Sequence, residues 1–197
     1  MTVSWTPHRF SGGLLALDTA NTVVLRGDVE RSFDRFADPA EIARFAAAAS
    51  VFRVDELGGR SLAAAGAIAG KVIAIREATD RLFRRSVLDG ALAAADLSPF
   101  LTSCAEGFAG SAEVFGLDTP FGTGSGPLAF EAALAVSALS LIRPEHLGRL
   151  RICPNCNWLF IDRSRNGSRL WCDMAVCGNR QKARRHYRRS KQEADDA

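Results

Sequence analysis

The stretch CPNCNWLFIDRSRNGSRLWCDMAVCGNR, residues 153–180, decides the fold of the C-terminal part of the chain, because it holds four of the five cysteines. They form two close pairs, Cys153-x2-Cys156 and Cys172-x4-Cys177, with 15 residues between the pairs. A close pair of thiolates grips one side of a tetrahedral ion, and a distant second pair completes its coordination. The spacing therefore predicts a structural zinc site with four protein ligands and no position open for catalysis.

Other uses of four cysteines have to be weighed against zinc. A thioredoxin-like redox site needs a βαβ setting, which the surrounding pattern does not offer. A disulfide framework conflicts with the cytoplasmic location expected below. An iron–sulfur cluster also takes four thiolates and stays open as an alternative. The fifth cysteine, Cys104, lies on an apolar helix face, so we expect a small buried residue there.

The residues between the ligands predict the local fold of this segment. Cys153-Pro154-Asn155-Cys156 is typical of a zinc knuckle, and Trp158–Ile161 has the aromatic and β-branched content of a strand. Asn166-Gly167 favours a hairpin turn after that strand. A helix is expected from about residue 179 to 191. Together these elements predict a treble-clef or ribbon-like zinc finger with a basic helix.

Charge is distributed very unevenly along the chain. Residues 1–150 have a net charge of −3, whereas residues 151–197 have a net charge of +6. Between residues 151 and 191 eleven Lys and Arg are opposed only by Asp162 and Asp173, which gives +9. Such asymmetry indicates a polyanion-binding segment joined to an acidic domain.

The predicted C-terminal helix carries most of this positive charge. Its basic residues are Arg180, Lys182, Arg184, Arg185, Arg188, Arg189 and Lys191. At 100° per residue several of them form one stripe, and a helix so charged cannot be buried in its own domain. Arginine donors match phosphate geometry, so we expect nucleic-acid binding. A non-catalytic adaptor that binds RNA or an acidic protein is the alternative. For Tyr187 we favour packing on the hairpin over base stacking.

The front of the chain predicts a domain that is mainly α with a small β component (α+β). Helices are expected over about 39–50, from Ser61 to Gly90, over 98–107 and over 128–142, on the basis of caps and apolar periodicity. Asp38 and Glu41 have a spacing like that of a capping box at the first of these. Residues 14–25 suit either a strand or a helix start, and 107–127 suit a hairpin or loop.

Several classes of protein are disfavoured by composition. The chain is 47% hydrophobic and 24% charged, as globular proteins are, and no 18-residue apolar stretch predicts a membrane span. The first ten residues lack a signal pattern, so we expect a cytoplasmic protein. His8, His146 and His186 are the only histidines, and none lies in a catalytic motif. We therefore do not expect an enzyme.

Cys177-Gly178-Asn179-Arg180, followed by the basic run from Lys182 to Tyr187, resembles the CGNR zinc-finger family. The resemblance extends upstream through the knuckle and covers roughly residues 145–191. It implies a DNA-binding zinc finger over 145–197. Leu17-Asp18-Thr19-Ala20-Asn21-Thr22 resembles the ABATE domain of stress-induced bacterial transcription regulators, although that family usually has an aromatic residue where Thr19 stands. This implies an ABATE-like domain over 1–144.

Two roles are open for a polar set in that front domain. Its members are Asp18, Asn21, Thr22 and Arg76. They could line a pocket that senses a small-molecule effector. Alternatively they are structural: Asp18 and Asn21 satisfy turns, and Asp18 pairs with Arg76. Because a lone finger buries a modest DNA interface, a homodimer or several binding sites are expected to add specificity.

Overall fold

A computed structural model describes residues 2–111, 121 and 126–195. The front of the chain is mainly helical with small sheets, as predicted. The helices are η1 (Pro7–Phe10), α1 (Leu15–Ala20), α2 (Ala40–Phe52), α3 (Ala69–Asp89), α4 (Ala94–Phe108), α5 (Phe130–Ser140), α6 (Pro144–Leu147), the π-helix η2 (Met174–Gly178) and α7 (Asn179–Asp195). The strands are β1 (Val23–Val24), β2 (Phe33–Asp34), β3 (Leu62–Ala63), β4 (Leu128–Ala129), β5 (Leu150–Ile152) and β6 (Leu159–Ile161).

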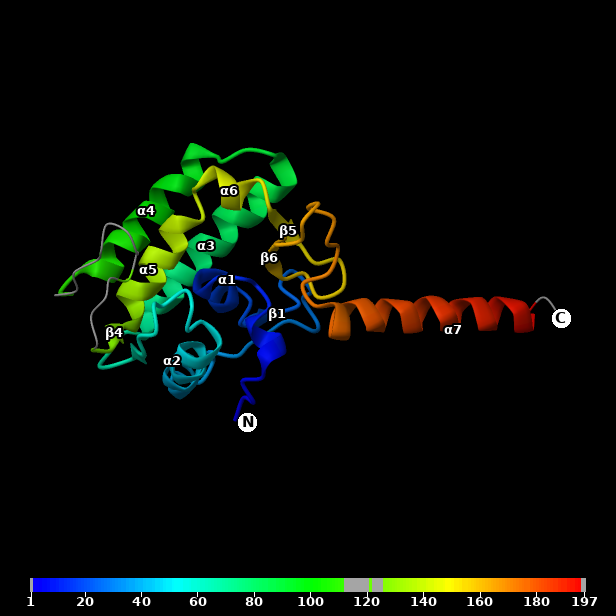
Figure 1. The fold of residues 1–197 in the computed structure, drawn as a ribbon, viewed down its shortest axis with the longest axis horizontal. Helices are drawn as coiled ribbons and strands as arrows, with labels where there is room; N and C mark the ends of the chain where they lie inside the picture. The colour runs from blue at the N-terminus through cyan, green and yellow to red at the C-terminus, as the bar shows by residue number, and fades with distance from the viewer. Residues whose placement is uncertain (1, 112–120, 122–125, 196–197) are drawn as a thin grey trace.

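The core of the body lies between α1, α3, α4 and α5. Helix α3 packs against α4 and α5, and the short α1 packs against α3 and α5 (Figure 1). All six residues of α1 are buried, the polar Asp18 and Thr19 among them, so this helix is enclosed by the body and is not a surface element. The core also includes Leu150, Leu159 and Ile161, which lie on the strands of the cysteine-rich segment. The segment is therefore anchored on the body.

Helix α2 confirms the helix predicted over residues 39–50. Its buried face includes Ile42, Phe45 and Ala49, and the Asp38 carboxylate accepts a hydrogen bond from the Ala40 N–H at 2.9 Å. The role expected for Glu41 in a capping box is wrong. Its carboxylate accepts hydrogen bonds from the Val3 N–H and the Trp5 indole N–H instead.

The long helix predicted from Ser61 begins later, at Ala69, and ends as predicted before Gly90, which has φ +72°. The periodicity upstream of Ala69 is misleading because Gly66 has φ +73°, which interrupts a right-handed helix. Leu62 and Ala63 form β3 instead, which pairs in parallel with β4. Because Leu128 and Ala129 form β4, the helix predicted from residue 128 starts two residues later, at Phe130.

Helix α4 starts at Ala94, four residues before the predicted position, and contains Pro99. Its buried Phe100 and Cys104 hold it in the core although proline removes one helical hydrogen bond. Most of the hairpin or loop expected over 107–127 lies outside the described residues. Residues 14–25 turn out to be helix α1 followed by β1, which pairs antiparallel with β2.

The hairpin of the cysteine-rich segment is formed by β5 and β6, with Ile152 opposite Leu159. The predicted hairpin through Asn166-Gly167 is therefore wrong, because the turn that joins the strands is the cysteine knuckle. The other edge of β6 is already occupied: the Ile161 N–H donates to the Gly12 carbonyl at 2.9 Å, and Asn21 binds Leu159.

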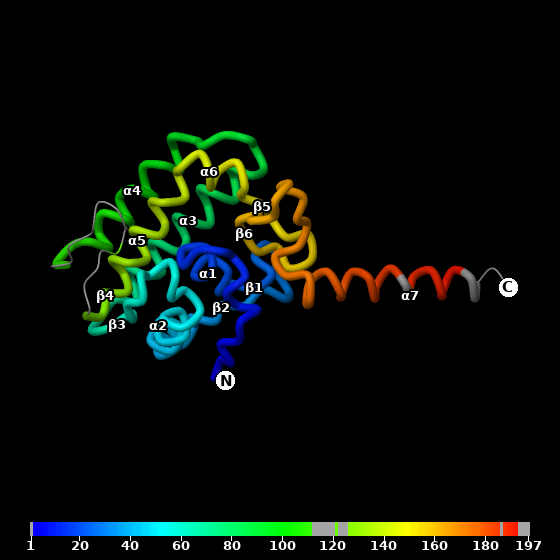
Figure 2. Tube along the Cα trace, viewed as in Figure 1, coloured from blue at the N-terminus to red at the C-terminus, as the bar shows by residue number. Residues whose placement is uncertain are grey.

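Helix α7 leaves the body as a single straight rod, with its start beside the hairpin (Figure 2). It extends from Asn179 to Asp195 and follows η2 directly. Within the described ranges, the helices are too short or too polar to cross a membrane.

Candidate metal centre and basic helix

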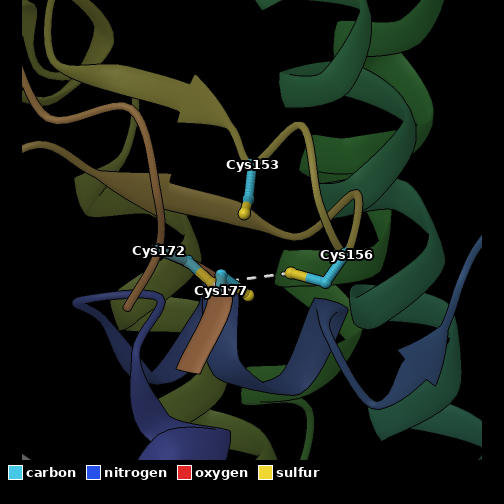
Figure 3. A group of neighbouring side chains, drawn as sticks. All are labelled: Cys153, Cys156, Cys172 and Cys177. Atoms are coloured by element: carbon cyan, nitrogen blue, oxygen red, sulfur yellow. Dashed lines mark hydrogen bonds between the residues drawn. The ribbon is translucent and has the colours of Figure 1, made fainter. Parts of the chain in front are cut away.

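The first cysteine pair lies on the turn between β5 and β6. The Cys153 N–H donates to the Trp158 carbonyl at 2.8 Å, and the Asn157 N–H donates to the Cys153 carbonyl at 2.8 Å. Asn157 has φ +63°, a conformation that asparagine tolerates better than most residues. These bonds close the turn tightly, so the sulfurs of Cys153 and Cys156 point to one side (Figure 3).

The second pair lies at the entrance to α7. Asp173 accepts hydrogen bonds from the Ala175 and Val176 N–H groups, and so caps the π-helix that carries Cys177. Burial disfavours the charge of Asp173, but hydrogen bonds from His8, Val176 and Ala175 outweigh it and lower the pKa of this carboxyl. The cap fixes the position of Cys177 relative to Cys172.

The four sulfur atoms converge (Figure 3) and all lie within 4.8 Å of one another. The Cys156 and Cys172 sulfurs are 3.5 Å apart, and those of Cys172 and Cys177 are 3.6 Å apart. Sulfurs at the corners of a tetrahedron, each about 2.3 Å from zinc, would be about 3.8 Å from one another. The set therefore fits a zinc ion in both ligand chemistry and spacing.

The surroundings of the sulfurs also suit a metal–thiolate centre. The Asn155 amide donates a hydrogen bond to the Cys177 sulfur at 3.2 Å, which favours the thiolate. Trp158 and Phe160 pack around the buried cysteines in a cluster of their own. Cys104 is remote from it in the body core, where burial raises the pKa of its thiol to about 12. The expectation of a small buried residue at Cys104 is confirmed.

The basic residues of α7 stand exposed on the projecting rod. Exposed side chains belong to Arg180, Lys182, Arg184, Arg185, Arg188, Arg189 and Lys191. Among the described residues none of these seven forms an ion pair with a carboxylate. The packing expected for Tyr187 is wrong, since 71% of this side chain is exposed. The rod does not fold back on the hairpin (Figure 2).

The polar set expected in the front domain is buried and hydrogen-bonded within the protein. The pairing expected between Asp18 and Arg76 is wrong. Asp18 accepts from Arg53 Nε at 2.5 Å and from the Gly12 N–H at 2.8 Å. Burial raises the pKa of Asp18 to about 6, and Arg53 opposes that rise.

Arg76 meets a different carboxylate, Asp34, through two hydrogen bonds of 2.7 and 2.8 Å. Thr22 accepts a further bond from Arg76 at 3.2 Å and donates to the Thr19 carbonyl. Nothing in the sequence singles out Arg53 as the partner of Asp18 or Asp34 as the partner of Arg76, because the two residues of each pair are far apart along the chain. These contacts favour the structural role for the set.

Contacts between the body and the cysteine-rich segment come from residues that the sequence pattern does not reveal. His8 lies 2.8 Å from Asp173, and the guanidinium of Arg84 donates to the carbonyl of Asn157 at 2.9 Å. The Asn157 amide donates to the Arg26 carbonyl at 2.7 Å. The body thus contacts the segment at Asp173 and at Asn157 of the cysteine knuckle.

Comparison with known proteins agrees with this geometry. Residues 149–190 match the model of the CGNR zinc-finger family. The match spans the hairpin, all four cysteines and the larger part of α7. A search of curated proteins found no match to the chain. The chain thus carries a CGNR zinc finger whose four neighbouring cysteines can hold a zinc ion.

Proposed function

We propose that this protein is a DNA-binding transcription regulator whose zinc finger presents α7 to the phosphate backbone. One observation carries the proposal: seven exposed basic side chains stand on a projecting helix, without carboxylate partners in the described part of the chain. When such a helix binds a polyanion, the repulsion among its own positive charges falls, and counterions are released from the polyanion.

The geometry of α7 supports duplex DNA as that polyanion. Arg180, Arg184 and Arg188 follow one another at four-residue steps, so they lie along one side of the helix. Seventeen residues at 1.5 Å each give a rod about 25 Å long. An α-helix fits the major groove, and arginine forks match phosphate oxygens. Contacts along such a stripe position a protein on DNA without reading its sequence.

Zinc would be the element that holds this helix in place. The cluster around the cysteines contains few apolar residues besides Trp158, Phe160 and Trp171. So small a core cannot fix a helix without metal. We propose that the finger is treble-clef or ribbon-like and that metal loss releases α7 from its fixed direction.

We propose for residues 1–144 an ABATE-like role in a stress-response regulator, with homodimerisation supplying specificity and with a small-molecule effector as the signal. A cytoplasmic location and the absence of catalysis belong to the same proposal. Two copies of α7 on one duplex would extend the modest interface that a single finger buries.

Charge reversal on the distal part of α7 tests the proposal. We expect R188E/R189E to weaken binding to a duplex DNA probe about a hundredfold, because two phosphate contacts become repulsions. The control R81E/R143E makes the same change of charge at exposed positions of the body and should bind as the wild type does. Zinc content should not change in either variant. Equal losses in both would contradict the proposal, and preferential binding of RNA would favour the adaptor alternative.

A further inference from the structure

A cavity of about 400 Å³ lies where the front of the chain meets the cysteine knuckle and the start of α7. Its arginines come from three separate parts of the chain: they are Arg9, Arg31, Arg35, Arg180 and Arg184. Figure 1 shows the N-terminal segment and β1 beside the base of α7. Because the walls come from both the body and the finger, the cavity forms only when the two are docked.

Positive charge in this cavity exceeds the local negative charge. Arg31 is paired with Asp28 at 2.5 Å. The other four arginines have no carboxylate within ion-pair distance among the described residues. Four thiolates around one Zn²⁺ would carry two negative charges in all, and the charge of Glu41 also acts on Arg9, so the four arginines are only partly balanced.

The surroundings of Arg35 disfavour its positive charge. Its guanidinium lies over the Trp158 ring at 5.4 Å and donates a single long hydrogen bond, of 3.3 Å, to the Asn21 carbonyl. Burial, together with the nearby charge of Arg9, lowers the pKa of Arg35 to about 10. Arg35 is half-buried and has no ion-pair partner among the described residues, so a bound anion would stabilise its guanidinium.

Two buried donors in the cavity wall also lack acceptors. They are one terminal nitrogen of Arg9 and the indole nitrogen of Trp158, and neither finds an acceptor in the described part of the structure. The Trp158 side chain is 4% exposed, and its ring is stacked on His8 at 5.2 Å. Both nitrogens are covered by protein, so a ligand with acceptor oxygens would reach them only after neighbouring side chains move.

We propose that this cavity binds a phosphate group, held by Arg9 and Arg35 of the body and by Arg180 and Arg184 of α7. The phosphate can belong to the DNA backbone next to α7 or to a free phosphorylated small molecule. In the first form the inference rests on the proposed function, whereas in the second it stands without it. In both forms the body supplies part of a site that the finger alone would lack.

The test uses the full-length, zinc-loaded protein with two probes, inorganic phosphate and duplex DNA. The variants are R9Q and R35Q, with R35K as the conservative variant and R81Q as the matched control on an exposed face of α3. Zinc content and melting temperature are measured for each, so that R9Q decides the result if R35Q does not fold.

We expect R9Q and R35Q to weaken binding of at least one probe about ten- to a hundredfold, because each removes a charge-assisted contact. R35K should recover part of that loss, and R81Q should match the wild type. Saturable binding of inorganic phosphate identifies a free ligand. A loss of DNA affinity with the salt slope reduced by about one identifies a backbone phosphate.

The inference is overturned if phosphate does not saturate the wild-type protein and R9Q and R35Q bind DNA as R81Q does. Because Arg188 and Arg189 do not line the cavity, their variant separates the two proposals. Loss of DNA binding in R188E/R189E alone, in a protein that inorganic phosphate does not saturate, supports the proposed function and overturns this inference. Phosphate binding that needs Arg9 and Arg35, in a protein that does not bind DNA, supports this inference and overturns the proposed function.

Discussion

The side chain of Asn21 forms two hydrogen bonds with the backbone of Leu159, although the two residues are 138 positions apart. Its amide nitrogen donates to the Leu159 carbonyl at 2.8 Å, and its oxygen accepts from the Leu159 N–H at 2.9 Å. Asn21 therefore acts as a neighbouring strand would, because it satisfies both backbone groups of a residue at the edge of β6 that does not pair with β5. One buried amide thus joins the body to the zinc finger.

Replacing the Asn21 amide should lower the stability of the folded protein. We expect N21A to lower the free energy of unfolding by about 2–4 kcal/mol, because two buried backbone groups lose their partners. The measurement is denaturant unfolding at constant zinc concentration. The control N166A alters an exposed asparagine and should change little. If N21A unfolds at the same denaturant concentration as N166A, the joining role of Asn21 is refuted.

Removing a single buried sulfur should abolish metal binding. We expect C172S to lose its zinc, because the remaining three cysteines cannot close a four-thiolate site. Zinc content is measured by elemental analysis of the purified protein, and fluorescence of Trp158 and Trp171, both beside the site, reports the local structure.

The matched control for that variant is C104S, which alters the one cysteine outside the cluster. We expect C104S to keep its zinc, even if a buried hydroxyl in the core lowers its stability by about 1–3 kcal/mol. Full zinc content in C172S, or zinc loss in C104S, would show that the ligand set is different.

The pH dependence of stability should reveal a buried carboxyl group at Glu56. Burial raises the pKa of this group to about 7, although Ser137 and the Leu15 N–H donate hydrogen bonds to it. The folded state therefore holds a proton that the unfolded state releases at lower pH. The protonated Glu56 carboxyl group stabilises the folded state fully below about pH 4.5, and this stabilisation is lost as the pH rises through about 7. At about 1.4 kcal/mol per pKa unit, the free energy of unfolding falls by up to about 3 kcal/mol.

Thermal unfolding between pH 5.5 and 8, in excess zinc, measures this effect. The wild-type protein should lose stability with rising pH relative to E56Q, which has no ionisable group at that position. E106Q, at an exposed position of α4, should follow the wild type. Parallel curves for the wild type and E56Q would mean that Glu56 is ionised in the folded protein throughout this range.

The parts that the sequence predicts well are those that local spacing determines. Cys153 and Cys156 lie on the tight turn of the knuckle, and Cys177 lies on a π-helix capped by Asp173. The spacing of the pairs predicts that the four sulfurs converge, as they do. Helix α2 likewise shows its buried face through Ile42 and Phe45, one turn apart. The exposure of the arginines on α7 follows from their number on one short helix.

The parts that the sequence does not predict depend on distant partners. The expected hairpin at Asn166-Gly167 fails because Asn21 and Gly12 already occupy the edge of β6. The predicted start of α3 fails because Leu62 pairs with Leu128, which lies far along the chain. The partner of Asp18 proves to be Arg53, a residue that no motif marks. Pairings of this kind cannot be read from periodicity.

Affinity for duplex DNA across a salt series, with zinc-loaded and chelator-treated protein, shows whether α7 binds phosphates and whether zinc is needed to hold it. With about five phosphate contacts from α7, the logarithm of affinity should fall with the logarithm of salt concentration at a slope near −4 to −5. Chelation should abolish this binding, and added zinc should restore it. Tight binding that changes with neither salt nor chelator would contradict the account.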